Sequence, residues 1–520
     1  MIRKILHTFW MVALVLGCLS CVREEIAPAT GGVGDGEGLL LLNFGVNESV
    51  EVQTKATLPA HTEQGVFNMY VFVFDKAGNK LAGQFFDSGN LVKGDNVDAD
   101  AVSNAKDNCW WVNNAKKDSE AGTNGRVKLR CSVGTGLTLY VIANLDSDMV
   151  RVSSDLLSSA VHEEKDLKAF TAFLNQEVVS RNGRFLMTGK VSGVTIKESE
   201  TGDICPSGKP LMLERVDAKV RFKFKKGENV KSFEARQWKV VNVPRVAYAL
   251  SYGQRGVAGD RGQDYGNVAP QTAREKYSEH AGKYFTTDFV NFEDFATDGT
   301  SEFSFYMMEN RQVPKITDKA EYKAGYHDRS RALKTANELN DKCSVSYTVN
   351  GVEHSRDMRM FKYANDFSTY VVVTGYVEME LKNDDAGKVL GGEVEYLIHL
   401  GDWREKEGSI DNYNIERNTS YTYTVTVNSL DKIRLEVETS KNGAEFKEEQ
   451  PGATGQVTIA KEEIALCDCH YVSKTISFRL SNFFKNGYVE AENCIVDELT
   501  WSVKTPFGEG EPSNTGDMDF

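Results

Sequence analysis

The feature that most constrains the fold is the strict alternation of apolar and charged side chains over residues 216–225. Successive side chains of a β-strand point to opposite faces, so a period of two predicts a strand with one buried face and one wet face. Such a strand must pair in a sheet and cover its apolar face with a second layer. The apolar members are Val216, Ala218, Val220, Phe222 and Phe224, and the charged members are Asp217, Lys219, Arg221, Lys223 and Lys225.

Most of the remaining chain shows strand patterns of the same kind. Some segments are apolar on both faces, as expected of a strand inside a packed sheet, and others alternate. Residues 154–176 instead have apolar positions that predict a helix across one end, and residues 88–126 are polar enough to predict a long surface insertion. The expected strands are residues 39–46, 66–75, 137–145, 370–379, 396–400, 421–427 and 433–437.

These patterns predict an all-β protein with two tandem antiparallel β-sandwich domains and a shorter C-terminal β module. Linker-like stretches, Glu198–Asp203 and Pro206–Gly208, separate the two sandwiches, and a second change of composition follows at Lys441–Gly455. The expected units are a signal peptide over 1–20, a glycine-rich flexible tether over 21–38, sandwiches over 39–200 and 205–440, and a module over 441–520 that ends without a closing strand.

The N-terminus has the layout of a secretory signal peptide. Arg3 and Lys4 give a positive start, and an apolar run from Phe9 to Leu16 follows. That run is shorter than the roughly 20 apolar residues that a membrane-spanning helix needs. Small residues and two cysteines come next, which indicates export rather than a membrane-spanning anchor.

A cysteine at this position resembles the lipobox of bacterial lipoproteins, in which a Leu precedes the lipidated Cys by three residues. Cys21 follows Ser20 but has Cys18 at the Leu position, whereas Cys18 has Val15 there. We expect Cys21 to carry the lipid because polar residues follow it at once, with Cys18 as the alternative. Several acyl chains such as palmitate make a durable anchor, which places the mature protein at the outer membrane.

Composition excludes some functions. The formal net charge is −14 and no basic block is present, which does not suit binding to nucleic acid. No HExxH, GxSxG or P-loop motif occurs, so we expect neither catalysis nor a bound cofactor.

The remaining candidate sites are weak. Cys467, Cys469 and His470 are the candidate metal ligands, but the usual Cys-x₂-Cys spacing is absent and a structural role is expected. His399 is expected to form hydrogen bonds at a strand end rather than act as a base. Trp110 and Trp111, in the polar insertion, leave open the alternative of a glycan-binding surface lipoprotein of a nutrient-uptake system.

A series of short motifs in collinear order resembles the fimbrillin superfamily, the lipoprotein pilins of Gram-negative anaerobes, in a large and less characterised branch. Each motif is weak alone, but together they span roughly residues 39–440. They are Thr54-Lys55-Ala56, Tyr70–Asp75, Tyr140–Leu145, the turn Met187-Thr188-Gly189, Arg215–Val220, Phe305–Arg311, Tyr370–Gly375 and the block from Leu400 to Tyr421.

The resemblance implies transthyretin-like sandwiches and assembly by strand exchange. In the family a protease cuts after a basic residue, the N-terminal strand leaves, and a strand of another subunit fills the groove. Lys55 matches the basic residue, and Leu39–Val46 matches the displaced strand. The resemblance also implies a fimbrial location, pilin-like partners and a receptor on a host or microbial surface. If Lys55 is not cut, the protein stays lipid-anchored as a pilus base or adhesin.

Overall fold

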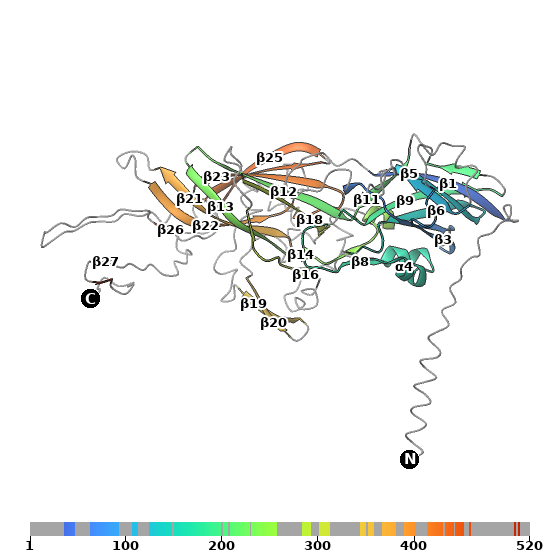
Figure 1. Ribbon diagram of the computed structural model, residues 1–520, viewed down its shortest axis with the longest axis horizontal. Coiled ribbons are helices and arrows are strands. Elements are labelled where there is room, and N and C mark those ends of the chain that lie inside the picture. The colour runs from blue at the N-terminus through green and yellow to red at the C-terminus, as the bar shows by residue number, and fades with distance from the viewer. Residues whose placement is uncertain are drawn as a thin grey trace, which may run out of the picture.

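The protein is an elongated molecule in which two β-sheet bodies lie end to end (Figure 1). The computed structural model describes the following residues: 36–46, 63–92, 107–112, 124–147, 150–181, 183–198, 201–205, 209–228, 230–256, 283–292, 301–311, 344–349, 352–357, 367–380, 389–401, 413–429, 432–440, 442–451, 457–458, 504–505 and 508–509.

The N-terminal body is built on a nine-stranded sheet of order β3-β2-β6-β9-β11-β1-β5-β4, with β10 also paired to β1. The sheet is mixed, because β1 runs parallel to β10 and β11 and antiparallel to β5. The strands are β1 (Glu37–Val46), β2 (Met69–Phe74), β3 (Lys80–Phe86), β4 (Cys109–Val112), β5 (Asn124–Ser132), β6 (Gly134–Ala143), β9 (Met187–Ile196), β10 (Thr201–Ile204) and β11 (Leu211–Arg215).

Strand β2 shows why this body has apolar residues on both faces of the sheet. All six of its side chains are buried. Tyr70, Phe72 and Phe74 join one core cluster, while Met69, Val71 and Val73 join another. The expectation that this segment is a doubly buried strand is therefore confirmed.

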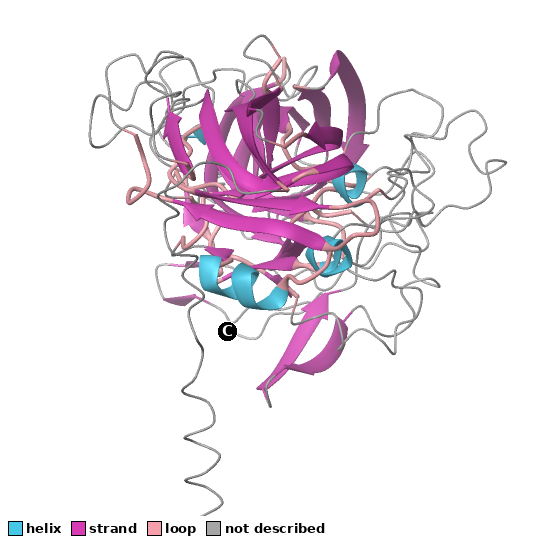
Figure 2. Ribbon diagram, turned by 90° about the vertical axis from the view of Figure 1, so that its right-hand side faces the viewer, coloured by secondary structure: helices cyan, strands magenta, loops and turns pink. Residues whose placement is uncertain are grey.

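Two short helices cover part of this sheet, and Figure 2 shows them along one side of the strands. They are α4 (Ser154–Ala160) and α5 (Glu164–Ala169). Ser153 caps α4 by accepting a hydrogen bond from the backbone N–H of Leu156. Leu157 and Leu167 are buried in the same cluster as Phe72. The helix expected over residues 154–176 thus exists as two helices, followed by strand β8 (Thr171–Leu174).

The second body is a sandwich of two five-stranded sheets, ordered β18-β12-β23-β24-β25 and β17-β13-β21-β22-β26. Aromatic rings fill the space between them: Phe303 stacks on Phe222 at 5.1 Å and on Trp238 at 4.2 Å. The strands are β12 (Asp217–Lys226), β13 (Val230–Val241), β17 (Val290–Asn291), β18 (Ser301–Met308), β21 (Tyr370–Glu380), β22 (Val389–His399), β23 (Ser420–Ser429), β24 (Lys432–Thr439), β25 (Asn442–Pro451) and β26 (Val457–Thr458).

The smaller elements lie at the junction of the bodies or form separate hairpins. A three-stranded sheet of order β15-β8-β7 joins the two bodies, because β15 follows β13 in sequence while β8 belongs to the N-terminal part. The remaining elements are β7 (Val150–Arg151), β14 (Val243–Pro244), β15 (Val246–Tyr248), α6 (Tyr252–Arg255), β16 (Tyr284–Phe285), β19 (Ser344–Val349), β20 (Val352–Asp357), β27 (Lys504–Thr505) and β28 (Gly508–Glu509).

The all-β class is confirmed, but the chain crosses between the bodies later than its linker-like composition indicated. Strands β10 and β11 both pair with β1, so residues 201–215 lie in the N-terminal sheet rather than in a linker or in the second sandwich. The crossing falls between Arg215, which ends β11, and Asp217, which begins β12. Strands β25 and β26, which the sequence placed in a separate module, pair with β24 and β22 of the second body.

Two local expectations also differ. Met187-Thr188-Gly189 begins strand β9 and is not a turn. The insertion over residues 88–126 contains strand β4, which pairs with β5.

Candidate functional site

Strand β1 is the first strand of the chain that the structure describes, and it occupies an inner position of the sheet. On one side its residues Glu37 to Gly45 pair with β5. On the other side Leu39 to Leu42 pair with β10, and Phe44 to Val46 pair with β11. Both backbone edges of β1 are therefore hydrogen-bonded, and removal of the strand would leave two facing strand edges without partners.

One face of β1 provides an apolar ridge that fills the core. Leu40 and Leu42 have 0% of their surface exposed, Phe44 has 1% and Val46 has 6%. These four side chains pack in one cluster with Met69, Val71 and Val127 among others. Burial alternates with a period of two from Glu37 to Leu42, whereas Asn43 to Val46 are buried on both faces.

The other face of β1 contains a buried amide. Asn43 is 4% exposed although its neighbours in sequence are apolar. Its Nδ2 donates to the carbonyl oxygen of Cys205, just after β10, at 2.6 Å. Its Oδ1 accepts a hydrogen bond from Nε of Arg126 on β5. One side chain thus connects β1 to both walls of its groove.

Two glycines allow the close approach of the neighbouring chain. At Gly38 of β1, a Cβ atom would overlap the backbone oxygen of Lys197 and lie 2.6 Å from Cγ2 of Ile196. At Gly125 of β5, a Cβ would overlap the backbone oxygen of Trp111 and lie 2.8 Å from Cζ of Phe44. Any larger residue at either position forces the backbone or the Phe44 ring to move.

Cys131 of β5 lies opposite Gly38 in the strand register. It is 4% exposed. Burial raises the pKa of the thiol to about 12, and the negative charge of Glu37 acts in the same direction. The thiol is therefore protonated and covered at neutral pH, and a reactive role is not expected of it.

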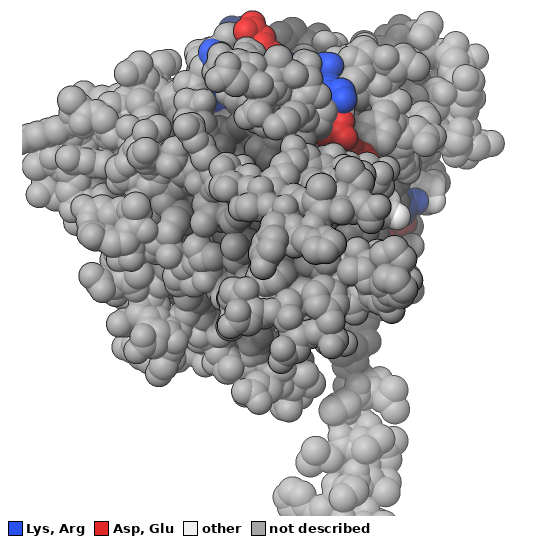
Figure 3. Space-filling view, turned by 90° about the vertical axis from the view of Figure 1, so that its left-hand side faces the viewer, with Lys and Arg blue, Asp and Glu red and all other residues white. Residues whose placement is uncertain are grey.

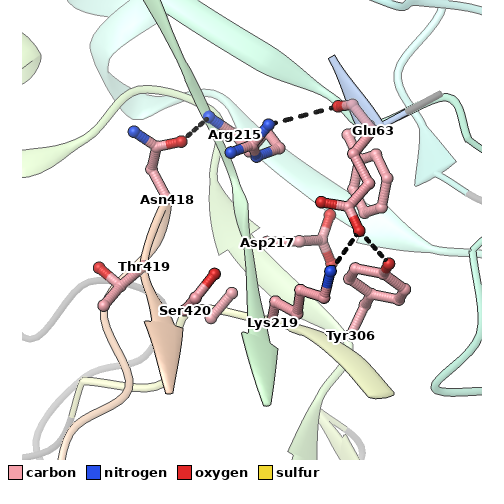
Figure 4. A pocket seen from close by; sticks show the side chains of 10 residues that line it. Glu63, Arg215, Asp217, Lys219, Tyr306, Asn418, Thr419 and Ser420 are labelled. Atoms are coloured by element: carbon pink, nitrogen blue, oxygen red, sulfur yellow. Dashed lines mark hydrogen bonds and ion pairs between the residues drawn. The ribbon is translucent and has the colours of Figure 1, made fainter. Parts of the chain in front are cut away.

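The chain downstream of β1 is fixed to the second body at Glu63. Lys219 Nζ of β12 donates to Glu63 Oε1 at 2.7 Å, and the Tyr306 hydroxyl of β18 donates to the same oxygen at 2.5 Å (Figure 4). Glu63 is 2% exposed. Arg215 adds a hydrogen bond to the backbone oxygen of Glu63 at 3.4 Å.

The same junction contains buried ion pairs. Arg181 donates to Asp217 Oδ1 from Nε at 3.1 Å and from its terminal nitrogen at 2.7 Å, with 1% and 2% of the two side chains exposed. Arg417 and Glu309 form a second pair at 2.6 Å, with 5% and 3% exposed. Arg215 lines a small cavity together with Glu63, Asp217, Lys219 and Tyr306 (Figure 4), and burial lowers the pKa of Arg215 below the ordinary arginine value. The Arg181–Asp217 pair joins the N-terminal part to the start of β12, whereas Arg417 and Glu309 both belong to the second body.

Among the described residues, charged side chains on the outer surface of the second body form pairs of opposite sign. On the sheet face formed by β13, β21 and β22, Arg236 pairs with Glu393 at 2.7 Å and with Glu234 at 3.4 Å. Seen from the end that lies on the left of Figure 1, charged side chains of both signs lie close together among the described residues (Figure 3).

The structure separates the residues predicted from sequence into two groups. Cys18, Cys21, Lys55, Cys467, Cys469 and His470 lie outside the described residues. Trp110 and Trp111 are 1% and 3% exposed in β4, so they are not the exposed rings that the alternative of glycan binding requires. Trp110 packs into the core, and Arg126 of the paired strand β5 lies over the Trp111 ring. His399 ends β22 and is 1% exposed.

Sequence reasoning missed Asn43, Arg126 and the Glu63 junction. A signal for Asn43 was present, because an amide inside the apolar run Leu39–Val46 must satisfy its polar atoms when buried. No local signal exists for Glu63, because its partners Lys219 and Tyr306 are more than 150 residues away in sequence.

No group of His, Cys, Asp and Glu among the described residues is arranged to hold a metal ion. Within the same part of the chain, none of the helices has the length and apolar character needed to cross a membrane.

Comparison with solved structures finds proteins of fimbriae and cell adhesion. The tip fimbrial protein Mfa3 of Porphyromonas gingivalis is 14% identical, with a TM-score of 0.39, over 78% of this chain and 99% of that one. A putative cell adhesion protein of Parabacteroides distasonis is 14% identical, with a TM-score of 0.42, over 80% and 99%. A fimbrilin (FimA) of Porphyromonas gingivalis is 12% identical, with a TM-score of 0.37, over 75% and 90%. A search of curated proteins found no significant match.

Comparison with protein families gives a match to the major fimbrial subunit protein (FimA) family over residues 40–215. This range begins in β1 and ends at the last residue of β11, so it covers the strands of the nine-stranded sheet. It also includes the Lys55, Tyr70–Asp75, Tyr140–Leu145 and Met187–Gly189 motifs on which the resemblance rests. Over residues 40–215 the chain therefore matches the FimA family, as the resemblance to the fimbrillin superfamily predicts.

Proposed function

We propose that the protein is a surface-exposed lipoprotein subunit of a fimbria, anchored through Cys21 or Cys18, that assembles with other pilin-like subunits by exchange of strand β1. The fimbrial role is supported by the family match over residues 40–215. The observation that carries the mechanism is the position of β1 between β5 and the β10–β11 edge, with Leu40, Leu42 and Phe44 fully buried.

A cut in the chain after β1 would allow this strand to leave the sheet. The chain that follows β1 is fixed to the second body from Glu63 onward, so a cut between Val46 and Glu63 leaves β1 held by non-covalent contacts alone. Lys55 lies in this interval. Departure of β1 would expose an apolar groove and unpaired backbone N–H and C=O groups, each costly unless it finds a new partner. A strand from a second subunit satisfies both demands.

The contacts of β1 with its groove are strong enough that β1 should leave quickly only when another strand replaces it. Burial of an aliphatic or aromatic side chain contributes about 1.5–3 kcal/mol, so the four side chains of the apolar ridge contribute roughly 6–12 kcal/mol before the entropy of ordering the strand is subtracted. A cut subunit should therefore keep β1 for some time when alone and lose it when a competing strand is present.

The test is limited proteolysis of the mature protein with a trypsin-like enzyme, followed by size-exclusion chromatography. Cleavage after Lys55 should convert a monomer into multimers, and deletion of residues 22–55 should do the same. The Lys55→Gln variant is the matched control and should remain uncut at this position and monomeric. A protein that is cut after Lys55 and stays monomeric with unchanged melting would contradict strand exchange and would favour a fixed lipid-anchored base or adhesin.

The structure does not support the alternative of a glycan-binding role. It rested on Trp110 and Trp111 as exposed rings, and both are buried. The proposed fimbrial subunit acts as an anchor, an accessory subunit or a tip of the fimbria.

A further inference from the structure

The groove that β1 fills contains two contacts that a merely apolar strand would not need. One is the amide of Asn43, which reaches both walls of the groove. The other is the backbone of Lys197, which lies so close to Gly38 that a Cβ atom has no room. Both contacts depend on the identity of one residue in the strand, and neither contributes to the apolar ridge.

We propose that the groove selects its incoming strand by a sequence code, with glycine at the position of Gly38, asparagine at the position of Asn43, and apolar residues at the positions of Leu40, Leu42 and Phe44. This inference rests on the proposed function, because it specifies which strands can replace β1. The preferred partner is an extended segment of another chain that carries this pattern in the direction of β1.

The asparagine is selected because its two polar atoms have opposite partners. Arg126 on β5 offers a donor, and the backbone oxygen of Cys205 offers an acceptor. An aspartate would keep the contact with Arg126 but would place a carboxylate oxygen against the Cys205 carbonyl. An alanine would lose both hydrogen bonds and leave the Cys205 oxygen and the guanidinium to find other partners. Only an amide of this length matches both walls.

The glycine is selected by the rigid backbone that it faces. Lys197 follows directly after β9, and its carbonyl oxygen cannot turn away as a flexible side chain could. Gly45, near the other end of β1, provides the matched control. A Cβ there would lie 3.4 Å from Sδ of Met212 and 3.5 Å from Cγ of Pro210, which are ordinary contacts with side chains.

Arg126 is positioned for this role by its own neighbours. It lies on β5 directly across from Asn43 in the register. Its guanidinium carbon is 6.0 Å from the centre of the Trp111 ring on β4. Strands β5 and β4, which hold Arg126 and the Trp111 ring, both remain when β1 leaves. Arg126 is therefore part of the groove and is available to donate a hydrogen bond to an incoming amide.

The test uses the full mature chain with a single introduced protease site within residues 47–62. After cutting, the protein is titrated with labelled peptides of residues 37–46 that carry a solubilising lysine tail, and binding is measured by fluorescence anisotropy. The Asn43→Ala peptide should bind about 30-fold more weakly than the wild-type peptide, since it loses one charge-assisted and one neutral hydrogen bond. Asn43→Asp should also bind more weakly, and Gly38→Ala should lose at least about 10-fold.

Two controls separate the code from general strand affinity. The Gly45→Ala peptide should bind within about 3-fold of the wild type, because its Cβ meets only ordinary contacts. In the chain variant Arg126→Ala, the difference between the wild-type and Asn43→Ala peptides should shrink, which is the signature of direct coupling in a double-mutant cycle.

The outcomes distinguish this inference from the proposed function. If the cut chain binds wild-type, Asn43→Ala and Gly38→Ala peptides equally, strands exchange without a code, and the inference is wrong while the proposed function stands. If the discrimination at position 43 persists in full in Arg126→Ala, the amide contact is not its cause and the inference is also wrong. If the cut chain binds no peptide and keeps its own β1, strand exchange itself is contradicted.

Discussion

Breaking the buried ion pair between Arg181 and Asp217 should lower the free energy of unfolding, by an amount that depends on the groups around the pair. Asp217 accepts two hydrogen bonds from Arg181, and both side chains are almost completely buried. Replacing Asp217 by Ala leaves the guanidinium of Arg181 buried without its counter-charge, and the loss of one partner of a buried pair costs about 3–5 kcal/mol. Arg181 keeps hydrogen bonds to the backbone oxygens of Val178 and Ser180, which favours the lower end, about 3 kcal/mol.

The matched control is Glu393→Ala, which breaks the exposed pair with Arg236. Those side chains are 45% and 43% exposed, and an exposed pair contributes about 0–1 kcal/mol. Urea unfolding of the two variants and of the wild type measures both changes. The double variant Arg181→Met/Asp217→Leu should recover most of the loss, since apolar residues can replace a buried pair. If Asp217→Ala costs no more than Glu393→Ala, the junction is not held by this pair and the reasoning is refuted.

Three further predictions concern lipidation, metal and pH. Cys21→Ala should abolish acyl labelling of the protein in cells while Cys18→Ala should not, and the reverse result would move the lipid to Cys18. Elemental analysis should find less than one zinc per chain, whereas one zinc that is lost in Cys469→Ser would show that Cys467, Cys469 and His470 bind metal. Stability should fall as the pH rises from about 8.5 toward about 12, because the unfolded chain loses the Cys131 proton first, and Cys131→Ser should remove that part of the slope.

Periodicity in the sequence was sufficient to identify the strands that build both cores. The residues of β2 read as a doubly buried strand and are one, and the alternation of Val220, Phe222 and Phe224 places these side chains in the core of the second sandwich. These signals are local, because the period of two depends only on neighbouring residues. The same reasoning identified β1 as an apolar strand.

Pairing between distant segments could not be predicted in this way. Pro206–Gly208 has linker composition, and nothing local shows that the strands on either side of it both return to β1. The junction contacts of Glu63 and the burial of Trp110 also depend on residues far away in sequence or on a strand hidden in a polar segment. A change in composition thus shows only that the local strand pattern is interrupted. It coincides with a domain boundary only when the strands on its two sides pair in different sheets.

Cys131 provides the most direct test of the proposal that β1 can leave its groove. The thiol lies on β5 opposite Gly38, so β1 covers it from one side. In the intact protein its raised pKa of about 12 and its burial should make alkylation at pH 8 very slow. Departure of β1 should expose the thiol, return its pKa toward about 8.5, and speed its reaction strongly.

The measurement is the rate of alkylation at Cys131, followed by mass spectrometry, before and after cleavage between Val46 and Glu63. The cut protein is immobilised and washed continuously, so that a released β1 fragment cannot bind again. A parallel measurement on Cys131→Ser gives the background from the other cysteines of the chain. Strand departure predicts that Cys131 stays protected in the intact chain and becomes reactive after the cut, with the fragment that contains β1 eluting separately. If Cys131 stays equally protected after complete cleavage and the fragment remains bound under conditions in which subunits assemble, β1 is a permanent part of the fold and the proposed mechanism is contradicted.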